Sequence, residues 1–112
     1  MTLPYMRFIN LMQAIKEATP AWPTLDPVED RMLTLLAAEW STDKKITTSD
    51  AIALMREISE STVHRRILSM QKKGVIKLDT DSVDRRIKNV VPTQLTLDYF
   101  TVLGNCFKPS LK

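Results

Sequence analysis

Apolar residues recur at helical spacing along several stretches of the chain. Tyr5, Phe8, Met12 and Ile15 follow one another at intervals of three or four residues, and no glycine interrupts them. This spacing predicts a helix over 3–18 with one apolar face.

The segment 19–24 contains two prolines and interrupts this pattern. A proline lacks an amide donor and restricts the residue before it, so we expect a linker there. Asp26 and Pro27 then predict the start of a second helix over 27–40, with Asp26 as N-cap, proline at the first position and two acidic residues in the first turn. Apolar residues on most of its circumference predict a central position.

The rest of the chain predicts short helices and strands. We expect an edge strand over 44–47 and then a helix over 48–56 capped by Thr47 or Thr48. A further helix would run from its N-cap Ser59 to Lys73. Strands over 75–78 and 86–91 would follow, and then a helix over 94–106 capped by Thr93. Gly74 would end the fourth helix, and Pro92 would end the strand pairing because it cannot donate to a ladder.

This order of elements predicts a mainly α (α+β) fold, because a tight pair of helices followed by a two-stranded hairpin is a winged helix-turn-helix. The fold would carry an added N-terminal helix and a C-terminal helix. We expect a dimerisation helix and linker at 1–25, a winged helix-turn-helix domain at 26–93, and a helix and tail at 94–112. Apolar residues beyond the needs of a winged helix would form the dimer surface: Tyr5, Phe8, Met12, Tyr99, Phe100, Leu103 and Phe107.

Composition is that of a soluble globular protein, with 44% hydrophobic and 26% charged residues among 112. No apolar run approaches the roughly 18 residues of a membrane span, so we expect a cytoplasmic protein without a membrane partner. The single cysteine, Cys106, excludes a disulfide framework and a cysteine-only zinc site. We expect Cys106 to be a small buried apolar residue; a redox sensor is the alternative. Trp22 and Trp40 are expected to anchor a core or an interface.

The net charge of +3 is modest, but its distribution is uneven. Residues 1–58 hold 6 Lys/Arg and 8 Asp/Glu, whereas residues 59–112 hold 10 and 5. The basic residues cluster between Arg65 and Lys88, as expected where an anionic polymer binds. A solvated basic face without a partner is the alternative.

The helix expected from 60 to 73 has one stripe that must be buried, formed by Val63, Ile67 and Met70. Residues outside this stripe would then point outward or sideways: Ser61, Thr62, His64, Arg65, Leu68 and Ser69. Because an α-helix fits the DNA major groove, Arg65 is the best candidate for a base contact, through guanine O6 and N7. Ser61 and Thr62 could donate to bases or phosphates, or simply cap the helix beside a solvated Arg65. His64 could contact a base or point into solvent.

Two segments resemble the MarR-type winged-helix regulators. Residues 61–76, STVHRRILSMQKKGVI, are similar to that family's recognition helix and following strand. Residues 84–93, DRRIKNVVPT, are similar to its Asp-x-Arg wing motif, in which a threonine follows seven residues after the arginine. The resemblance covers about 26–105 and implies a DNA-binding winged helix.

The wing would bring arginine to the DNA minor groove, because Arg85 and Arg86 flank the loop tip. Strand alternation would place them on opposite faces, so only one would insert. The resemblance implies that this residue is Arg86, with Asp84 orienting a neighbouring arginine. Four lysines would contact phosphates without reading sequence, or would form an ordinary solubilising surface: Lys72, Lys73, Lys77 and Lys88.

Together these features predict sequence-specific double-stranded DNA binding by a homodimeric transcriptional regulator, with 60–73 in the major groove and 79–86 in the minor groove. The alternative is a winged-helix protein–protein interaction module in a replication or plasmid-maintenance complex. We expect no enzymatic activity, cofactor or metal, because there is no phosphate-binding glycine loop, nucleophile elbow or histidine placed among carboxylates. Three loop aspartates, Asp79, Asp81 and Asp84, lack the glycine and terminal glutamate of an EF-hand. No residue points to a small-molecule effector.

Overall fold

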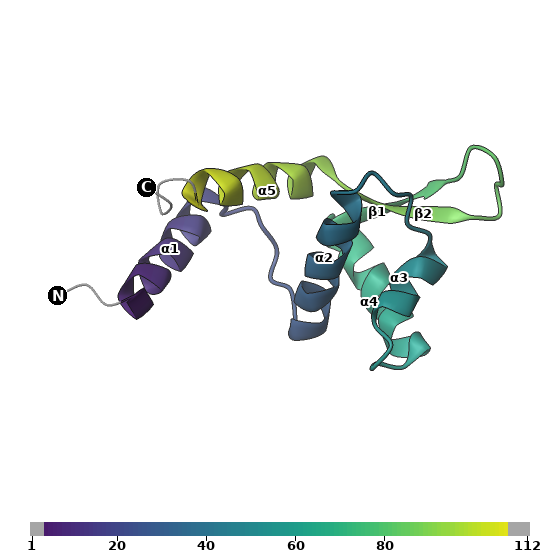
Figure 1. Ribbon diagram of the computed structural model, residues 1–112, viewed down its shortest axis with the longest axis horizontal. Helices are drawn as coiled ribbons and strands as arrows, with labels where there is room; N and C mark the ends of the chain where they lie inside the picture. Colours follow the sequence, from purple (N-terminus) through teal and green to yellow (C-terminus); the bar gives the residue numbers. More distant parts are fainter. Residues whose placement is uncertain (1–3, 108–112) are drawn as a thin grey trace. The chain divides into compact units, whose positions relative to one another are not determined.

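The computed structural model describes residues 4–107, with side chains as far as Asn105. This part of the chain contains five helices and one two-stranded sheet (Figure 1). The elements are α1 (Pro4–Ala18), α2 (Pro27–Trp40), α3 (Thr48–Leu54), α4 (Glu60–Lys72), β1 (Ile76–Thr80), β2 (Lys88–Pro92) and α5 (Gln94–Phe107). They form two compact units: one is Pro23–Thr93, and the other contains α1, the segment up to Trp22, and α5.

The helices of the Pro23–Thr93 unit begin at capping residues, as the sequence predicts. Asp26 accepts a hydrogen bond from the Glu29 amide (2.8 Å), and the Glu29 carboxylate accepts one from the Asp26 amide (3.0 Å), so the pair forms a capping box. Thr47 and Asp50 form the same box at α3. At α4, the Ser59 hydroxyl accepts from the Thr62 amide.

The end of α4 confirms the role predicted for Gly74. Its φ is 80°, in the left-handed region that favours glycine. The Gly74 amide donates to the Gln71 carbonyl and the Val75 amide to the Met70 carbonyl, each at 3.0 Å. These two bonds are a Schellman motif, which ends the helix and directs the chain into β1.

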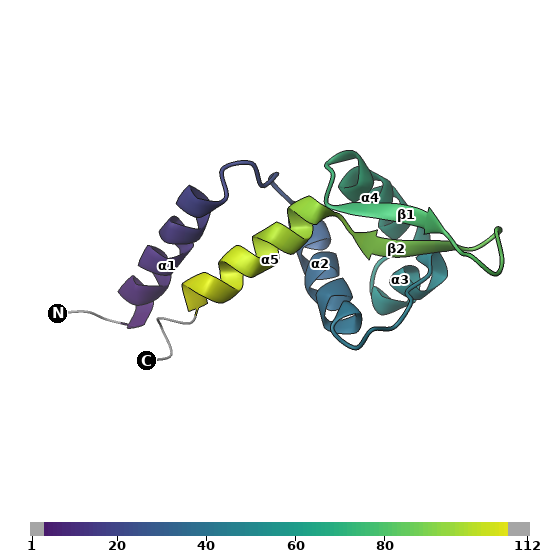
Figure 2. The same ribbon diagram turned by 90° about the horizontal axis from the view of Figure 1, so that it is seen from above.

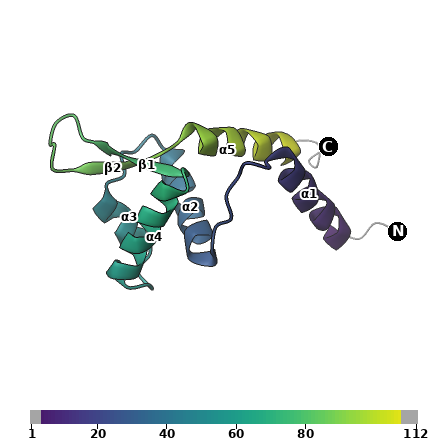
Figure 3. The same cartoon turned by 180° about the vertical axis from the view of Figure 1, so that it is seen from behind.

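The three helices α2, α3 and α4 lie on one side of the β1–β2 hairpin (Figures 1 and 3). Val63, Ile67 and Met70 are fully buried, as their spacing predicts. They share the core with residues from the other elements and from the segments between them: Met32, Leu33, Leu36, Ile46, Ala51, Met55, Val75, Ile76 and Val90. Burial of this stripe orients the opposite face of α4 toward solvent.

The hairpin differs in detail from the predicted strands. β1 and β2 pair antiparallel from Ile76↔Pro92 to Thr80↔Lys88, so β1 begins one residue later and β2 two residues later than predicted. Pro92 is therefore the last paired residue of β2, at a strand end where the absence of an amide donor is tolerated. The loop between the strands projects away from the three helices (Figure 2).

Two other elements are shorter than predicted. The expected edge strand over 44–47 consists of one bridge, Thr47↔Asn89, beside a hydrogen bond from the Val90 amide to the Ile46 carbonyl. Its pairing is short because Thr47 is already the N-cap of α3. That helix ends at Leu54, since the chain turns at Met55.

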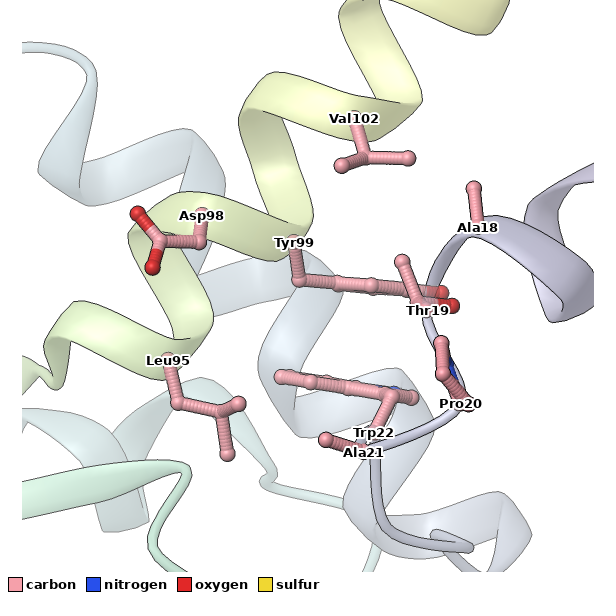
Figure 4. A pocket seen from close by; sticks show the side chains of 9 residues that line it. All are labelled: Ala18, Thr19, Pro20, Ala21, Trp22, Leu95, Asp98, Tyr99 and Val102. Carbon is pink, nitrogen blue, oxygen red and sulfur yellow. The ribbon is translucent and has the colours of Figure 1, made fainter.

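In the other unit, α1 contacts α5. The Trp22 ring stacks on Tyr99 with centroids 3.9 Å apart and planes 5° apart (Figure 4). A pocket of about 160 Å³ adjoins this stack, lined by Ala18, Thr19, Pro20, Ala21, Trp22, Leu95, Asp98, Tyr99 and Val102. The side chains of Cys106 and Phe107 lie outside the described residues. No helix within residues 4–107 combines the length and the apolar character of a membrane span.

Candidate nucleic-acid interface

The exposed face of α4 carries polar and basic side chains around one leucine. Ser61, Arg65, Leu68 and Lys72 follow at helical spacing, opposite the buried stripe, and all four are exposed. Leu68 keeps 47% of its surface in solvent, although it is apolar. His64 is exposed beside them. This face can offer hydrogen-bond donors, positive charge and one apolar contact.

The first turns of α4 show which residues cap the helix and which do not. Ser59 is the N-cap, and its hydroxyl also donates to Thr62 Oγ1 at 2.8 Å. Arg65 Nη2 donates to the same Thr62 oxygen at 3.3 Å. Ser61 and Thr62 are therefore not the capping residues, and Thr62 helps to orient Arg65.

Two residues predicted to contact DNA, Lys73 and Ser69, lie against other parts of the protein. Lys73 Nζ lies 2.6 Å from Glu29 Oε1 and 2.9 Å from the Thr24 carbonyl, so its charge is already paired. Ser69 is half-buried beside the same Glu29 carboxylate. Both side chains are therefore less accessible than the exposed face of α4, and their DNA contacts stay predictions.

Arg66, part of the predicted basic cluster, is also paired. Its Nη1 lies 3.0 Å from Oδ2 of Asp26, the N-cap of α2. Positions 66 and 73 lie next to the buried stripe on the helix, and their side chains reach the start of α2 while keeping part of their surface in solvent. This adjacency is the sequence signal that could have identified them.

Glu29 is the buried centre of these contacts, with none of its surface exposed. Burial raises the pKa of its carboxyl. The hydrogen bonds from the Asp26 amide and Lys73, the nearby Ser69 hydroxyl and the charge of Lys73 together lower this pKa by a larger amount. The net pKa lies below the ordinary value, so Glu29 is ionised at neutral pH.

The wing orients one arginine. The Asp84 carboxylate accepts hydrogen bonds from the Arg86 amide (3.0 Å), Nε (3.2 Å) and Nη2 (3.3 Å). These bonds lower the pKa of Asp84, against burial and the negative charge of Asp81, which raise it. The Arg86 side chain is nonetheless 91% exposed, so it is held in place and open to a ligand.

The prediction that strand alternation separates Arg85 from Arg86 is wrong. β2 begins only at Lys88, so both arginines lie in the loop, where alternation does not apply. Both are exposed. Lys77 and Lys88 are exposed on the hairpin, and Lys88 Nζ donates to Thr80 Oγ1 across the strands at 2.7 Å.

Asp81 is a residue of the wing whose role the sequence analysis missed. Its carboxylate accepts hydrogen bonds from Asn89 Nδ2 and from the amides of Asp84 and Val83, each at 3.0 Å. These bonds hold its pKa far below the ordinary value; burial opposes this shift and the charge of Lys45 adds to it. An aspartate that begins a short polar loop is typical of an Asx turn. This position in the sequence is the signal that could have indicated the role of Asp81.

The described residues offer no metal centre, because no three His, Cys, Asp or Glu side chains gather among them as a metal site would require. Asp81 and Asp84 instead accept protein hydrogen bonds. The arrangement is suited to binding a polyanion through oriented arginines and surrounding lysines.

Several solved structures share the fold. S. aureus MepR bound to ethidium bromide matches 99% of this chain and 81% of its own, at 18% identity and a TM-score of 0.65. The S. aureus MepR–DNA complex matches 96% of this chain and 76% of its own, at 18% identity and a TM-score of 0.59. The adhesin competence repressor AdcR of Streptococcus pyogenes matches 98% and 77%, at 20% identity and a TM-score of 0.55.

These neighbours confirm the winged helix-turn-helix fold, with a two-stranded wing and helices before and after it. The resemblance to MarR-type regulators is thereby confirmed for the fold. No protein-family model and no curated protein matches the chain.

Proposed function

We propose that this protein is a transcriptional regulator that binds double-stranded DNA in a sequence-specific way and acts in the cytoplasm. One observation carries the proposal: two exposed arginines of one winged-helix unit, Arg65 on α4 and Arg86 on the wing, are each oriented by a side-chain acceptor. One of the similar structures, MepR, is a DNA complex, which supports the same use of the fold.

In this proposal, α4 enters the major groove and the wing, residues 79–86, reaches the adjacent minor groove. Arg65 pairs with a guanine, while Ser61, Thr62 and His64 contact bases or phosphates near the start of the helix. The remaining exposed cations bind the phosphate backbone: Lys72, Lys77, Arg85 and Lys88. Arg86 inserts into the minor groove, where negative potential is strongest when the groove is narrow.

We assign DNA binding to residues 26–93 and dimerisation to residues 1–25 and 94–112. α1 has no buried residue, and a run of its apolar side chains is exposed: Tyr5, Met6, Phe8, Ile9 and Met12. A second copy of the chain would cover this face. The two-fold axis would then place two copies of α4 about one helical turn of DNA apart.

The proposal is tested by fluorescence anisotropy with a random-sequence duplex at two salt concentrations. Micromolar binding that weakens steeply with salt is expected. The double variant Arg65→Ala/Arg86→Ala should bind much more weakly, whereas Arg7→Ala, which removes the same kind of charge from α1, should not. Absence of binding at low salt would overturn DNA binding and favour the protein–protein interaction module.

A further inference from the structure

The wing loop carries two carboxylates, Asp81 and Asp84, although it belongs to the surface that we propose meets DNA. A negative charge close to phosphates repels them and weakens binding. A carboxylate at this position is therefore expected to have a different role. Asp84 has such a role, because it holds Arg86. Asp81 does not contact Arg86 directly, so its presence requires a separate explanation.

The Asp81 side chain is only 12% exposed, within a loop whose neighbouring residues are largely exposed. Its Oδ2 accepts the amides of Val83 and Asp84, and the Asp81 amide donates to the Ile87 carbonyl at 2.9 Å. One residue therefore shapes the loop from inside and closes its base.

The other oxygen of Asp81 connects the loop to the helical part of the unit. Oδ1 accepts from Asn89 Nδ2 at 3.0 Å and lies 3.5 Å from Lys45 Nζ. Asn89 is buried and forms the bridge with Thr47, the N-cap of α3. Asp81 thus links the wing loop to β2 and to the segment that begins α3.

We infer that Asp81 is a positioning residue for Arg86, acting through Asp84. Asp81 holds the amide of Asp84, and the carboxylate of Asp84 holds the guanidinium of Arg86. A long exposed arginine otherwise samples many rotamers, and ordering it on DNA would cost conformational entropy. The chain Asp81–Asp84–Arg86 fixes that side chain before DNA is bound.

The charge of Asp81 and its positioning of Arg86 predict opposite effects of Asp81→Ala on DNA affinity, so the variant distinguishes the two. Asp81→Ala and Asp79→Ala each remove one negative charge, and Asp79 is an exposed residue of β1 two positions away. If charge alone mattered, both variants would bind a DNA duplex more tightly. We expect Asp79→Ala to bind as tightly as the wild type or more tightly, and Asp81→Ala to bind about tenfold more weakly.

The coupling to Arg86 is measured by a double-variant cycle. In an Arg86→Ala background, Asp81→Ala should cause little further loss of DNA affinity, because the residue that it positions is already absent. Fully additive losses, or tighter binding by Asp81→Ala, would overturn the inference. Asp81→Asn, which keeps an oxygen for the two loop amides, provides a milder variant if Asp81→Ala does not fold.

The DNA measurements rest on the proposed function, so a second readout uses the free protein. NMR relaxation of the Arg86 Nε–H should show greater mobility in Asp81→Ala than in the wild type or in Asp79→Ala. Unchanged mobility would overturn the positioning role whether or not DNA binds. Failure of the wild type to bind DNA, with Arg86 mobilised as expected, would overturn only the proposed function.

Discussion

The ammonium group of Lys73 lies 2.6 Å from Oε1 of Glu29, a fully buried residue in the first turn of α2. The same ammonium donates to the Thr24 carbonyl. This pair joins the C-terminal end of α4 to the linker and to the capping box of α2. The pair therefore holds the C-terminal end of α4 against the start of α2.

Removal of Lys73 should destabilise the fold. Lys73→Ala leaves the Glu29 charge buried with fewer partners, and we expect the free energy of unfolding to fall by about 2 kcal/mol. Lys72→Ala, which changes the exposed neighbour, should alter it by less than about 0.5 kcal/mol. Urea denaturation of both variants checks this. The double variant Glu29→Met/Lys73→Met should regain much of the loss, and equal effects of Lys72→Ala and Lys73→Ala would contradict the structural role.

Stability should fall in acid. Glu29, Asp81 and Asp84 all have pKa values lowered in the folded protein, so the folded state binds fewer protons than the unfolded chain around their ordinary values. The stabilisation is complete above those ordinary values, about 4.5 for Glu and 3.8 for Asp, and is lost as the pH falls through the lower folded values.

Thermal unfolding between pH 6 and pH 2.5 measures this loss. Asp81→Asn should flatten the dependence of stability on pH below about 4, because it removes a group with a strongly lowered pKa. Asp79→Asn is the matched control. A slope unchanged by Asp81→Asn would contradict the hydrogen bonds assigned to that carboxylate.

Arg65 and Lys72 should affect DNA binding differently. Arg65→Ala should cost about 1–3 kcal/mol on the preferred site and relax specificity at one position, because it removes the bidentate guanine contact that we propose. Lys72→Ala should weaken binding to all sequences alike and reduce its salt dependence. Site selection followed by titration on preferred and random duplexes checks both. Equal losses on both kinds of DNA for the two variants would remove Arg65 from base reading.

The exposed apolar face of α1 should control the oligomeric state. Phe8→Ser/Met12→Ser should convert a dimer into a monomer in sedimentation velocity experiments at micromolar concentration, because it removes apolar area that a second copy would bury. Lys16→Ser, which changes a polar position of α1, should leave the dimer intact. A monomeric wild-type protein would contradict the dimer proposal.

The two glycines should respond to alanine with opposite signs. Gly74→Ala should destabilise the protein by about 1 kcal/mol, because an L-residue rarely adopts its φ of 80°. Gly104 lies within α5, where a Cβ would meet no atom within 4 Å. Gly104→Ala should therefore stabilise the helix by about 0.5–1 kcal/mol. Chemical denaturation of the two variants provides the comparison, and equal signs would contradict the Schellman geometry.

Local sequence determined the helices and the general fold of this protein. Asp26-Pro27 at α2, Ser59 at α4 and Gly74 beyond it act on backbone groups within a few residues, so their roles could be predicted without tertiary contacts. The buried stripe of α4 followed from helical spacing alone. The order of these elements was then sufficient to predict a winged helix-turn-helix.

Tertiary structure decided which side chains of that fold are free to bind a ligand. Lys73 and Lys72 are adjacent and chemically identical, but only Lys73 meets Glu29, a residue 44 positions earlier. In the wing, Asp81 contacts Lys45, 36 positions away, and Asn89 of β2, and these contacts tie the loop to the rest of the unit. Such pairings depend on how separate elements pack, and local propensity carries no information about them.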